Sequence, residues 1–197
     1  MKTEFSKEIA DILRRKRGYA DYFHFGDDKP GTECGVVLDW LHARYGNGEE
    51  RFTTMEFLAP PLDPPDVILV DHESCRHGLE VTELVDHSTL AAHIKHQSLD
   101  WKEYEETELS RLIVERIGKK DGKPFRNGPF FSKTLLIYSD EPAIAGGEGA
   151  KFLGRFPRVS SAFFDEIWFV IPPETSPRGA VFGLVPEENN CRIYQLK

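Results

Sequence analysis

Two acidic residues in the middle of the chain are spaced so that they could hold a metal ion. Asp66 opens the apolar run 67–70, and Glu80 lies in the next such run, 79–85, with Thr82 two residues after it. Alternate side chains of a strand share a face, so Glu80 and Thr82 project together. If Asp66 meets Glu80, two carboxylates and a backbone carbonyl make a hard oxygen site suited to Mg²⁺ or Mn²⁺. Such an ion activates water and neutralises charge on a phosphodiester.

The same residues also have a purely structural interpretation. Asp66 follows Pro64 and Pro65 and could complete a turn, while Glu80 could be a solvent-facing strand residue. The register between the two strands decides which side chains meet, and it cannot be read from the sequence. Spacing alone therefore leaves both interpretations open.

The elements around these residues are predicted to hold Asp66 in a fixed geometry. The connector 59–65 is rich in proline, which forces extended backbone and forbids helix. Turn signals occupy residues 72–78, between the two strands. A helix is expected at 33–44, with Thr32 as its N-cap and Glu33 in its first turn.

The pattern along the rest of the chain predicts alternating helices and strands. Apolar residues follow one face of a helix expected at 99–120, and the apolar run 134–138 predicts a buried strand. Other expected elements are strands at 51–58, 164–171, 180–185 and 192–196 and an irregular helix at 151–162. This order is typical of an α/β (α+β) protein with a mixed central sheet flanked by helices, and we expect a single domain over residues 1–197.

Charge narrows the choice of partners. The 197 residues carry a net charge of −8, so DNA or RNA would have to bind at a local basic patch rather than through the field of the whole protein. Residues 14–17 are all basic and are one candidate patch, although cations also suit the C-terminus of the helix expected at 3–17. A homodimer or another protein partner is a further possibility.

The cysteines and the apolar runs indicate a compartment. Cys34, Cys75 and Cys191 are isolated and odd in number, which favours a reducing environment. No apolar run reaches the ~20 residues of a membrane helix, and the N-terminus lacks the apolar core of a signal peptide. We therefore expect a cytoplasmic protein without a membrane partner.

The segment PDVILVD…GLEVTEL resembles the core of the PD-(D/E)XK nuclease-like superfamily. Pro65 and Asp66 are followed by thirteen residues and then by Glu80, Val81 and Thr82. More narrowly, this segment and the stretch 117–137, IGKKDGKPFRNGPFFSKTLLI, are similar to a branch of uncharacterised bacterial proteins with a "PDF…G(I/V)EVTEL" pattern. The resemblance covers roughly residues 33–137.

This resemblance implies a fold, an activity and a set of roles. It implies a restriction-endonuclease-like core that hydrolyses DNA or RNA with a divalent metal. It also implies that Asp66 and Glu80 bind Mg²⁺ or Mn²⁺ and that Glu33, on the preceding helix, is an outer ligand.

One position departs from the motif. The superfamily has a Lys two residues after the Glu, and this chain has Thr82. An ammonium group there can orient the attacking water and stabilise negative charge, which Thr cannot do. Three interpretations stay open. Lys95, Lys119 or Lys120 could supply the ammonium, or the metal alone could suffice, with Thr82 orienting water or a neighbouring ligand. Alternatively, the site is inactive, and the fold serves as a nucleic-acid- or protein-binding module in regulation or defence.

Overall fold

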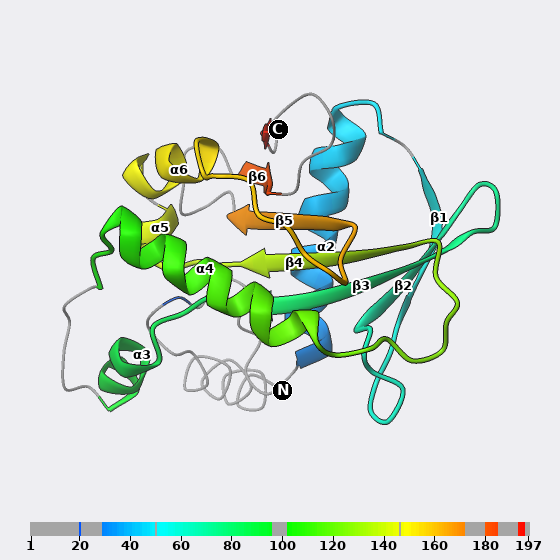
Figure 1. Cartoon of the computed structure of the whole chain (residues 1–197), viewed down its shortest axis with the longest axis horizontal. Helices are drawn as coiled ribbons and strands as arrows, with labels where there is room; N and C mark the ends of the chain where they lie inside the picture. The colour runs from blue at the N-terminus through cyan, green and yellow to red at the C-terminus, as the bar shows by residue number, and fades with distance from the viewer. Residues whose placement is uncertain are drawn as a thin grey trace, which may run out of the picture.

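A mixed β-sheet with helices on both faces forms the body of the molecule, and this confirms the expected α/β class (Figure 1). The structure is a computed structural model, and it describes residues 20, 29–49, 51–95, 102–145, 147–171, 180–184 and 193–195. The basic residues 14–17 and Cys191 lie outside the described residues. Within the described ranges, no helix combines the length and the hydropathy needed to cross a membrane.

The seven strands found among the described residues lie in the sheet in the order in which they occur in the sequence. The central pairs β3–β4 and β4–β5 are parallel, and each pair is joined by a helical crossover. The pairs toward both edges are antiparallel, including the late strands β6 and β7. The strands are β1 (Phe52–Phe57), β2 (Val67–Asp71), β3 (Arg76–Glu83), β4 (Ser132–Tyr138), β5 (Glu166–Ile171), β6 (Ala180–Gly183) and β7 (Ile193–Gln195).

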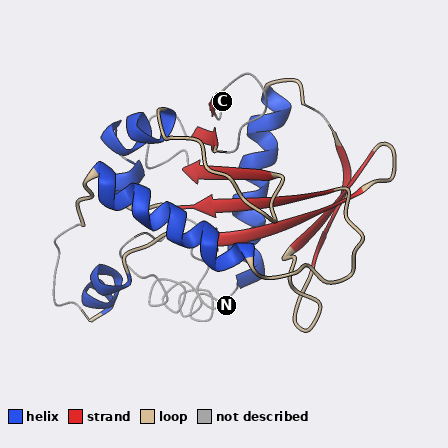
Figure 2. Cartoon of the chain, in the orientation of Figure 1, coloured by secondary structure: helices blue, strands red, loops and turns tan. Residues whose placement is uncertain are grey.

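The two faces of the sheet pack against different helices (Figure 2). On one face α2 packs Val37 and Trp40 into a core that includes Leu136 of β4. On the other face α4 packs Ile113 into a core that includes Leu135. Adjacent residues of β4 thus enter opposite cores, as expected for a strand buried on both sides. The helices are α2 (Lys29–Gly46), α3 (His87–Ile94), α4 (Glu106–Asp121), α5 (Pro142–Ala145) and α6 (Gly147–Gly154).

Several element boundaries differ from those predicted. Helix α2 begins at Lys29, so Thr32 is not its N-cap but lies inside it. Pro30 does not exclude a helix there, because the N–H groups of a first turn have no partner within the helix. Helix α4 begins at Glu106 rather than near residue 99. Helix α6 ends at Gly154, and residues 155–162 are not helical; Pro157 disfavours a continuation.

The turn between β2 and β3 is shorter than predicted. Strand β3 begins at Arg76, so Gly78 lies inside the strand and does not close the turn. The ring of Phe125 packs directly over Gly78, and a Cβ added there would lie 2.6 Å from Phe125 Cδ2. Close approach of an aromatic ring, and not turn conformation, therefore explains the glycine.

We expect Gly78→Ala to destabilise the fold by about 1–3 kcal/mol, the usual cost of overpacking a core. The ring of Phe125 cannot retreat easily, because it already meets the rings of Phe163 and Phe164 at 5.1 and 5.9 Å. Gly118→Ala is the matched control, since nothing lies within 4 Å of its added Cβ and alanine favours a helix. The urea midpoint measures both variants. An unchanged midpoint for Gly78→Ala would contradict the packing argument.

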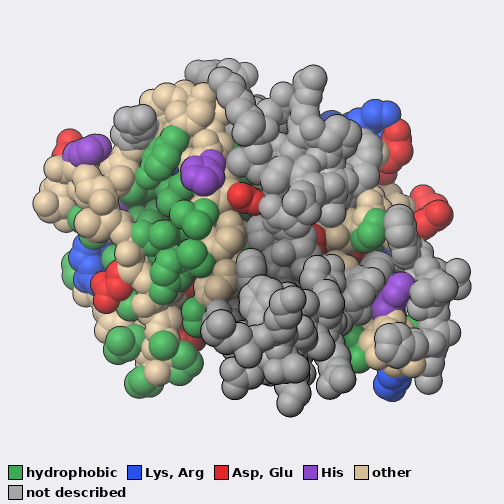
Figure 3. Space-filling view, turned by 180° about the vertical axis from the view of Figure 1, so that it is seen from behind, with side chains coloured by type: hydrophobic (Ala, Val, Ile, Leu, Met, Phe, Trp, Pro, Cys, Tyr) green, Lys and Arg blue, Asp and Glu red, His purple; other side chains and the backbone are tan. Residues whose placement is uncertain are grey.

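Hydrophobic side chains are unevenly distributed over the rear face of the molecule. Viewed from behind, hydrophobic side chains gather on the half of this face near β1 and β2 (Figure 3). Met55 and Phe57 of β1 are half-buried and pack against the α2-side core. Leu62, in the proline-rich connector, is 49% exposed. This apolar surface borders Asp66, because Phe57 pairs with Val67 and the N–H of Leu58 donates to the carbonyl of Asp66.

Candidate active site

The antiparallel register of β2 and β3 brings Asp66 to Glu80. Val67 pairs with Leu79, so the residues flanking this pair lie across from each other. Asp66 Oδ2 accepts a hydrogen bond from the backbone N–H of Val81 at 2.9 Å. The carbonyl of Asp66 also accepts from the N–H of Leu58, which fixes its backbone against the segment after β1. Asp66 is therefore held against the peptide that follows Glu80.

Glu33 joins this group from α2, through a lysine. Lys29 lies one helical turn before Glu33, and its Nζ is 2.8 Å from Glu33 Oε1 and 2.9 Å from Asp66 Oδ1. A longer contact of 4.0 Å reaches Asp63. The ammonium thus bridges the two carboxylates. Sequence reasoning missed Lys29 because the helix was expected to begin only at residue 33. Its i,i+4 spacing from Glu33 becomes informative only once α2 is known to begin at Lys29.

A second lysine reaches the site from α4. Lys120 Nζ lies 2.5 Å from Glu80 Oε1. Of the three lysines considered as replacements for the motif Lys, this is the one that the structure places at the carboxylates. Lys119 is exposed on α4, and Lys95 is exposed at the C-terminal end of α3. A lysine ammonium therefore does lie at the carboxylates, but it comes from α4 and not from position 82 of β3.

Thr82 lies on the same face of β3 as Glu80, as predicted, and is 7% exposed. Among the described residues it makes no hydrogen bond to Glu33, Asp66 or Glu80. Its role as a residue that orients a neighbouring ligand gains no support from this geometry.

Burial makes the charges of the three carboxylates interact strongly. Glu33, Asp66 and Glu80 are only 5%, 3% and 6% exposed. Burial, followed by the charge of Asp66, raises the pKa of Glu33 to about 7, although Lys29 opposes the shift. Burial and then the charge of Asp66 also raise the pKa of Glu80, against the effect of Lys120. Burial and the charge of Asp66 thus outweigh the nearby lysines and favour the protonated forms of Glu33 and Glu80.

The surroundings favour the charged form of Lys29, whereas they favour the neutral forms of Glu33 and Glu80. Burial works against its charged form, but hydrogen bonds to Glu33 and Asp66 outweigh that cost and raise its pKa. Its side chain is 64% exposed, so the ammonium reaches the buried carboxylates from the solvent side. Lys29 is a permanent counter-ion at neutral pH.

One buried oxygen of the site has no partner. Glu80 Oε2 is buried and accepts no hydrogen bond from the described residues, an arrangement that costs free energy unless something binds there. A hard cation suits such an oxygen, and Asp66 and Glu80 provide the carboxylate donors that Mg²⁺ and Mn²⁺ prefer. The residues present thus fit the implied ion.

The carboxylates are not arranged as a finished metal cage. Within the part of the chain that the structure describes, no group of three or more His, Cys, Asp or Glu side chains has the geometry of a metal site. Lys29 and Lys120 instead lie on the carboxylates. An arriving cation would share Asp66 and Glu80 with these ammonium groups, so metal affinity depends on how readily the lysines move aside.

A hollow lined by two basic and two acidic side chains lies past the C-terminal end of β3. It measures about 200 Å³ and lies between the C-terminal end of β3, the start of α3 and helix α4. Arg116 and Lys119 line it, one helical turn and one residue before Lys120, and Asp86 and Glu115 contribute acidic groups. Basic residues of α4 therefore line this hollow and also contact Glu80.

The chain matches no protein-family model, no curated protein and no solved structure.

Proposed function

We propose that this protein is a divalent-metal-dependent nuclease with a restriction-endonuclease-like core, which hydrolyses phosphodiesters of DNA or RNA. The observation that carries the proposal is the environment of Glu80. One of its oxygens is buried without a partner, and the other contacts Lys120 Nζ. A carboxylate that is open to a cation on one side and bonded to an ammonium on the other suits the positioning of water for attack on phosphate.

Each residue has a role in this proposal. Asp66 and Glu80 would hold Mg²⁺ or Mn²⁺, which would supply a Lewis acid that lowers the pKa of water and neutralises phosphate charge. Asp66 is kept in place by the N–H of Val81. Lys120 orients the water and stabilises the negative charge that develops on phosphate. Lys29 keeps the acidic pair Glu33 and Asp66 from repelling the polyanionic substrate.

Two basic residues that line the hollow support nucleic acid as the substrate. Arg116 and Lys119 lie on the same helix as Lys120, and neither forms an ion pair with a described residue. A backbone phosphate next to the cleaved bond would find counter-charge there. A chain of net charge −8 needs such local basic groups in order to bind a polyanion, and here they lie beside Asp86 and Glu115.

A second candidate is a catalytically inactive binding module of the same fold. Lys29 favours it, because its ammonium already bridges two of the three carboxylates without a metal. In this alternative the ion pairs are structural, and Glu80 stays unmetallated. The two candidates differ in whether a divalent cation binds at all.

Calorimetry with Mn²⁺, followed by cleavage of a panel of DNA and RNA substrates, tests the proposal. We expect Mn²⁺ to bind and cleavage to depend on it, and we expect both to be lost in Asp66→Ala and in Glu80→Ala. Glu56→Ala is the matched control, because Glu56 is an exposed acid on β1. Cleavage that survives both site substitutions would refute the assignment. Absence of Mn²⁺ binding to the wild type would favour the inactive module.

A further inference from the structure

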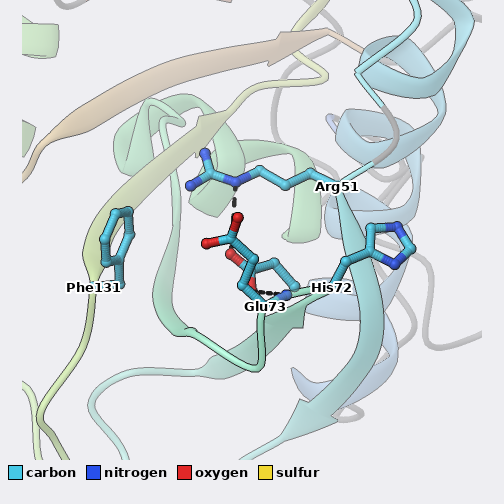
Figure 4. Close-up of a pocket in the computed structure, with 5 residues that line it drawn as sticks. Arg51, His72, Glu73 and Phe131 are labelled. Carbon is cyan, nitrogen blue, oxygen red and sulfur yellow. Dashed lines mark hydrogen bonds and ion pairs between the residues drawn. The ribbon is translucent and has the colours of Figure 1, made fainter.

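A second pocket lies at the turn between β2 and β3, four residues along β3 from Glu80. It measures about 230 Å³ and is lined by Arg51, Asp71, His72, Glu73 and Phe131. Arg51 and Phe131 approach it from opposite sides, while the ring of His72 turns away from the Arg51 guanidinium (Figure 4). The pocket is smaller than the 300–1,000 Å³ of sites for drug-sized ligands, so it suits a single ring system.

The acidic side of this pocket is rigidly held. Asp71 Oδ1 accepts hydrogen bonds from the N–H groups of Glu73 and Cys75, both at 2.9 Å. Asp71 Oδ2 is 3.0 Å from His77 Nε2, and His77 Nδ1 is 2.7 Å from Ser132 Oγ. The hydrogen bond from His77 lowers the pKa of Asp71, so this carboxylate is ionised. The turn is thus tied to the start of β4 before any ligand arrives.

The aromatic side is fixed to the same framework but open to solvent. Phe131 is 68% exposed, the highest value among the large hydrophobic residues described as exposed. Its N–H donates to the carbonyl of Arg76 at 2.7 Å, and its ring lies 5.5 Å from the ring of His77. The guanidinium of Arg51 lies 5.9 Å from the ring centroid of Phe131. A rigid, exposed ring next to an arginine is a stacking surface.

The charges of the pocket select against phosphate. Asp71 and Glu73 contribute two carboxylates, and Arg51 contributes one positive charge. Asp71 already accepts three hydrogen bonds. The carboxylate of Glu73 has no hydrogen bond or ion pair with a described residue, so it is available to a ligand. A planar, uncharged ligand that donates hydrogen bonds to Glu73 and accepts them from Arg51 fits this arrangement.

We propose that this pocket binds an unpaired guanine base. Guanine stacks on Phe131, donates N1–H and N2–H to Glu73, and accepts at O6 and N7 from Arg51. Adenine and cytosine present a ring nitrogen acceptor where guanine has N1–H, so they would face the carboxylate unfavourably. Uracil and thymine offer one N–H donor instead of two. Because Glu73 reads the edge that base pairing uses, the guanine must be single-stranded or flipped out.

The inference deepens the proposed function and rests on it only in taking the base to be part of the substrate strand. Arg76 and Glu80 are four residues apart on β3, about 13 Å at the usual strand rise. A strand with its scissile phosphate at Glu80 has neighbouring bases within that range. The pocket would therefore give the nuclease a preference for guanine near the cleaved bond.

Binding titrations of the full chain in EDTA test the inference without cleavage. The ligands are GMP, AMP, CMP and UMP, together with single-stranded oligonucleotides that contain one guanine, inosine or adenine. We expect guanine to bind about tenfold more tightly than the other bases, with inosine intermediate because it lacks the N2 amino group. Binding of the guanine oligonucleotide identifies a base in a strand as the ligand, and binding of GMP alone identifies a free nucleotide.

Three variants assign the contacts. Phe131→Ala should weaken guanine binding by about 5- to 150-fold, the usual effect of losing a stacking ring. Because Phe131 is exposed, the substitution should leave the fold intact. Glu73→Gln should abolish the preference for guanine, and the control Glu56→Gln should leave it unchanged. Equal affinity for all four bases, or an unchanged affinity in Phe131→Ala, overturns the inference. Guanine binding should persist in Glu80→Ala, which separates this pocket from the metal site. Loss of guanine binding there would also overturn the inference.

Discussion

Replacing Lys120 with methionine is expected to lower the rate of metal-dependent cleavage by about 10²- to 10³-fold, the usual cost of removing one group that stabilises transition-state charge. Lys120 Nζ is 2.5 Å from Glu80 Oε1, and methionine keeps much of the side-chain length but removes the charge. The measurement is kcat at saturating Mn²⁺, so that a change in metal affinity does not pass for a change in chemistry.

A second substitution separates a catalytic ammonium from a structural one. In the Lys120→Met background, Thr82→Lys places an ammonium at the position where the PD-(D/E)XK motif has it. Residues 80 and 82 share a face of β3, so the new lysine reaches the space that Lys120 has left. We expect it to recover at least about tenfold of the lost rate. Lys151→Met, on the exposed surface of α6 and away from the site, should retain the wild-type rate. Full activity in Lys120→Met would show that its ammonium plays no part in the reaction.

The pairing of Asp66 with Glu80 shows what the sequence can and cannot predict. The two strands and their acids are visible in the alternation of apolar and polar residues. Their register is not, because it depends on where the turn ends. Gly78 was interpreted as a turn residue, whereas it lies in the strand beneath Phe125. The packing of a ring 47 residues later in the chain thus determines a local boundary.

The two lysines of the site illustrate a different limit. The role of Lys29 could not be predicted, because the next residues, Pro30 and Gly31, are typical of loops. Its role follows only from a helix that begins at Lys29. Lys120 was one of three candidates because nothing local distinguishes them. The contact with Glu80 joins residues 40 positions apart and depends on how α4 crosses β3. Contacts of this kind are set by the packing of whole elements, which a local pattern does not encode.

Replacing Lys29 with methionine is expected to destabilise the metal-free protein by about 1–3 kcal/mol at pH 8. Glu33 and Asp66 are buried and share this ammonium as their counter-ion, so both lose it at once. Lys151→Met is the matched control, because Lys151 pairs with Glu148 on the exposed surface of α6 and such pairs contribute little. Urea unfolding in EDTA measures both variants.

The pH dependence of this loss follows from Glu33. Burial, followed by the charge of Asp66, raises its pKa to about 7 in the wild type, and Lys29 acts to lower it; removing Lys29 therefore raises the pKa of Glu33 further. The variant then binds the Glu33 proton more tightly than the wild type does. Its stability relative to the wild type consequently falls as pH rises through 7, and the difference is smaller at pH 5, where Glu33 is protonated in both proteins. Adding Glu33→Gln should remove this pH dependence.

The effect of Mn²⁺ on the melting temperature distinguishes a metal site from a purely structural set of ion pairs around Lys29. If Asp66 and Glu80 form a metal site, a divalent cation replaces the positive charge that Lys29→Met removes. Mn²⁺ should then raise the melting temperature of Lys29→Met by more than that of the wild type or of Lys151→Met, because binding to the native state stabilises it. A variant that Mn²⁺ leaves unchanged would mean that the ion pairs are structural. That result would favour the inactive binding module, since the carboxylates would then lack both their natural cation and an affinity for another.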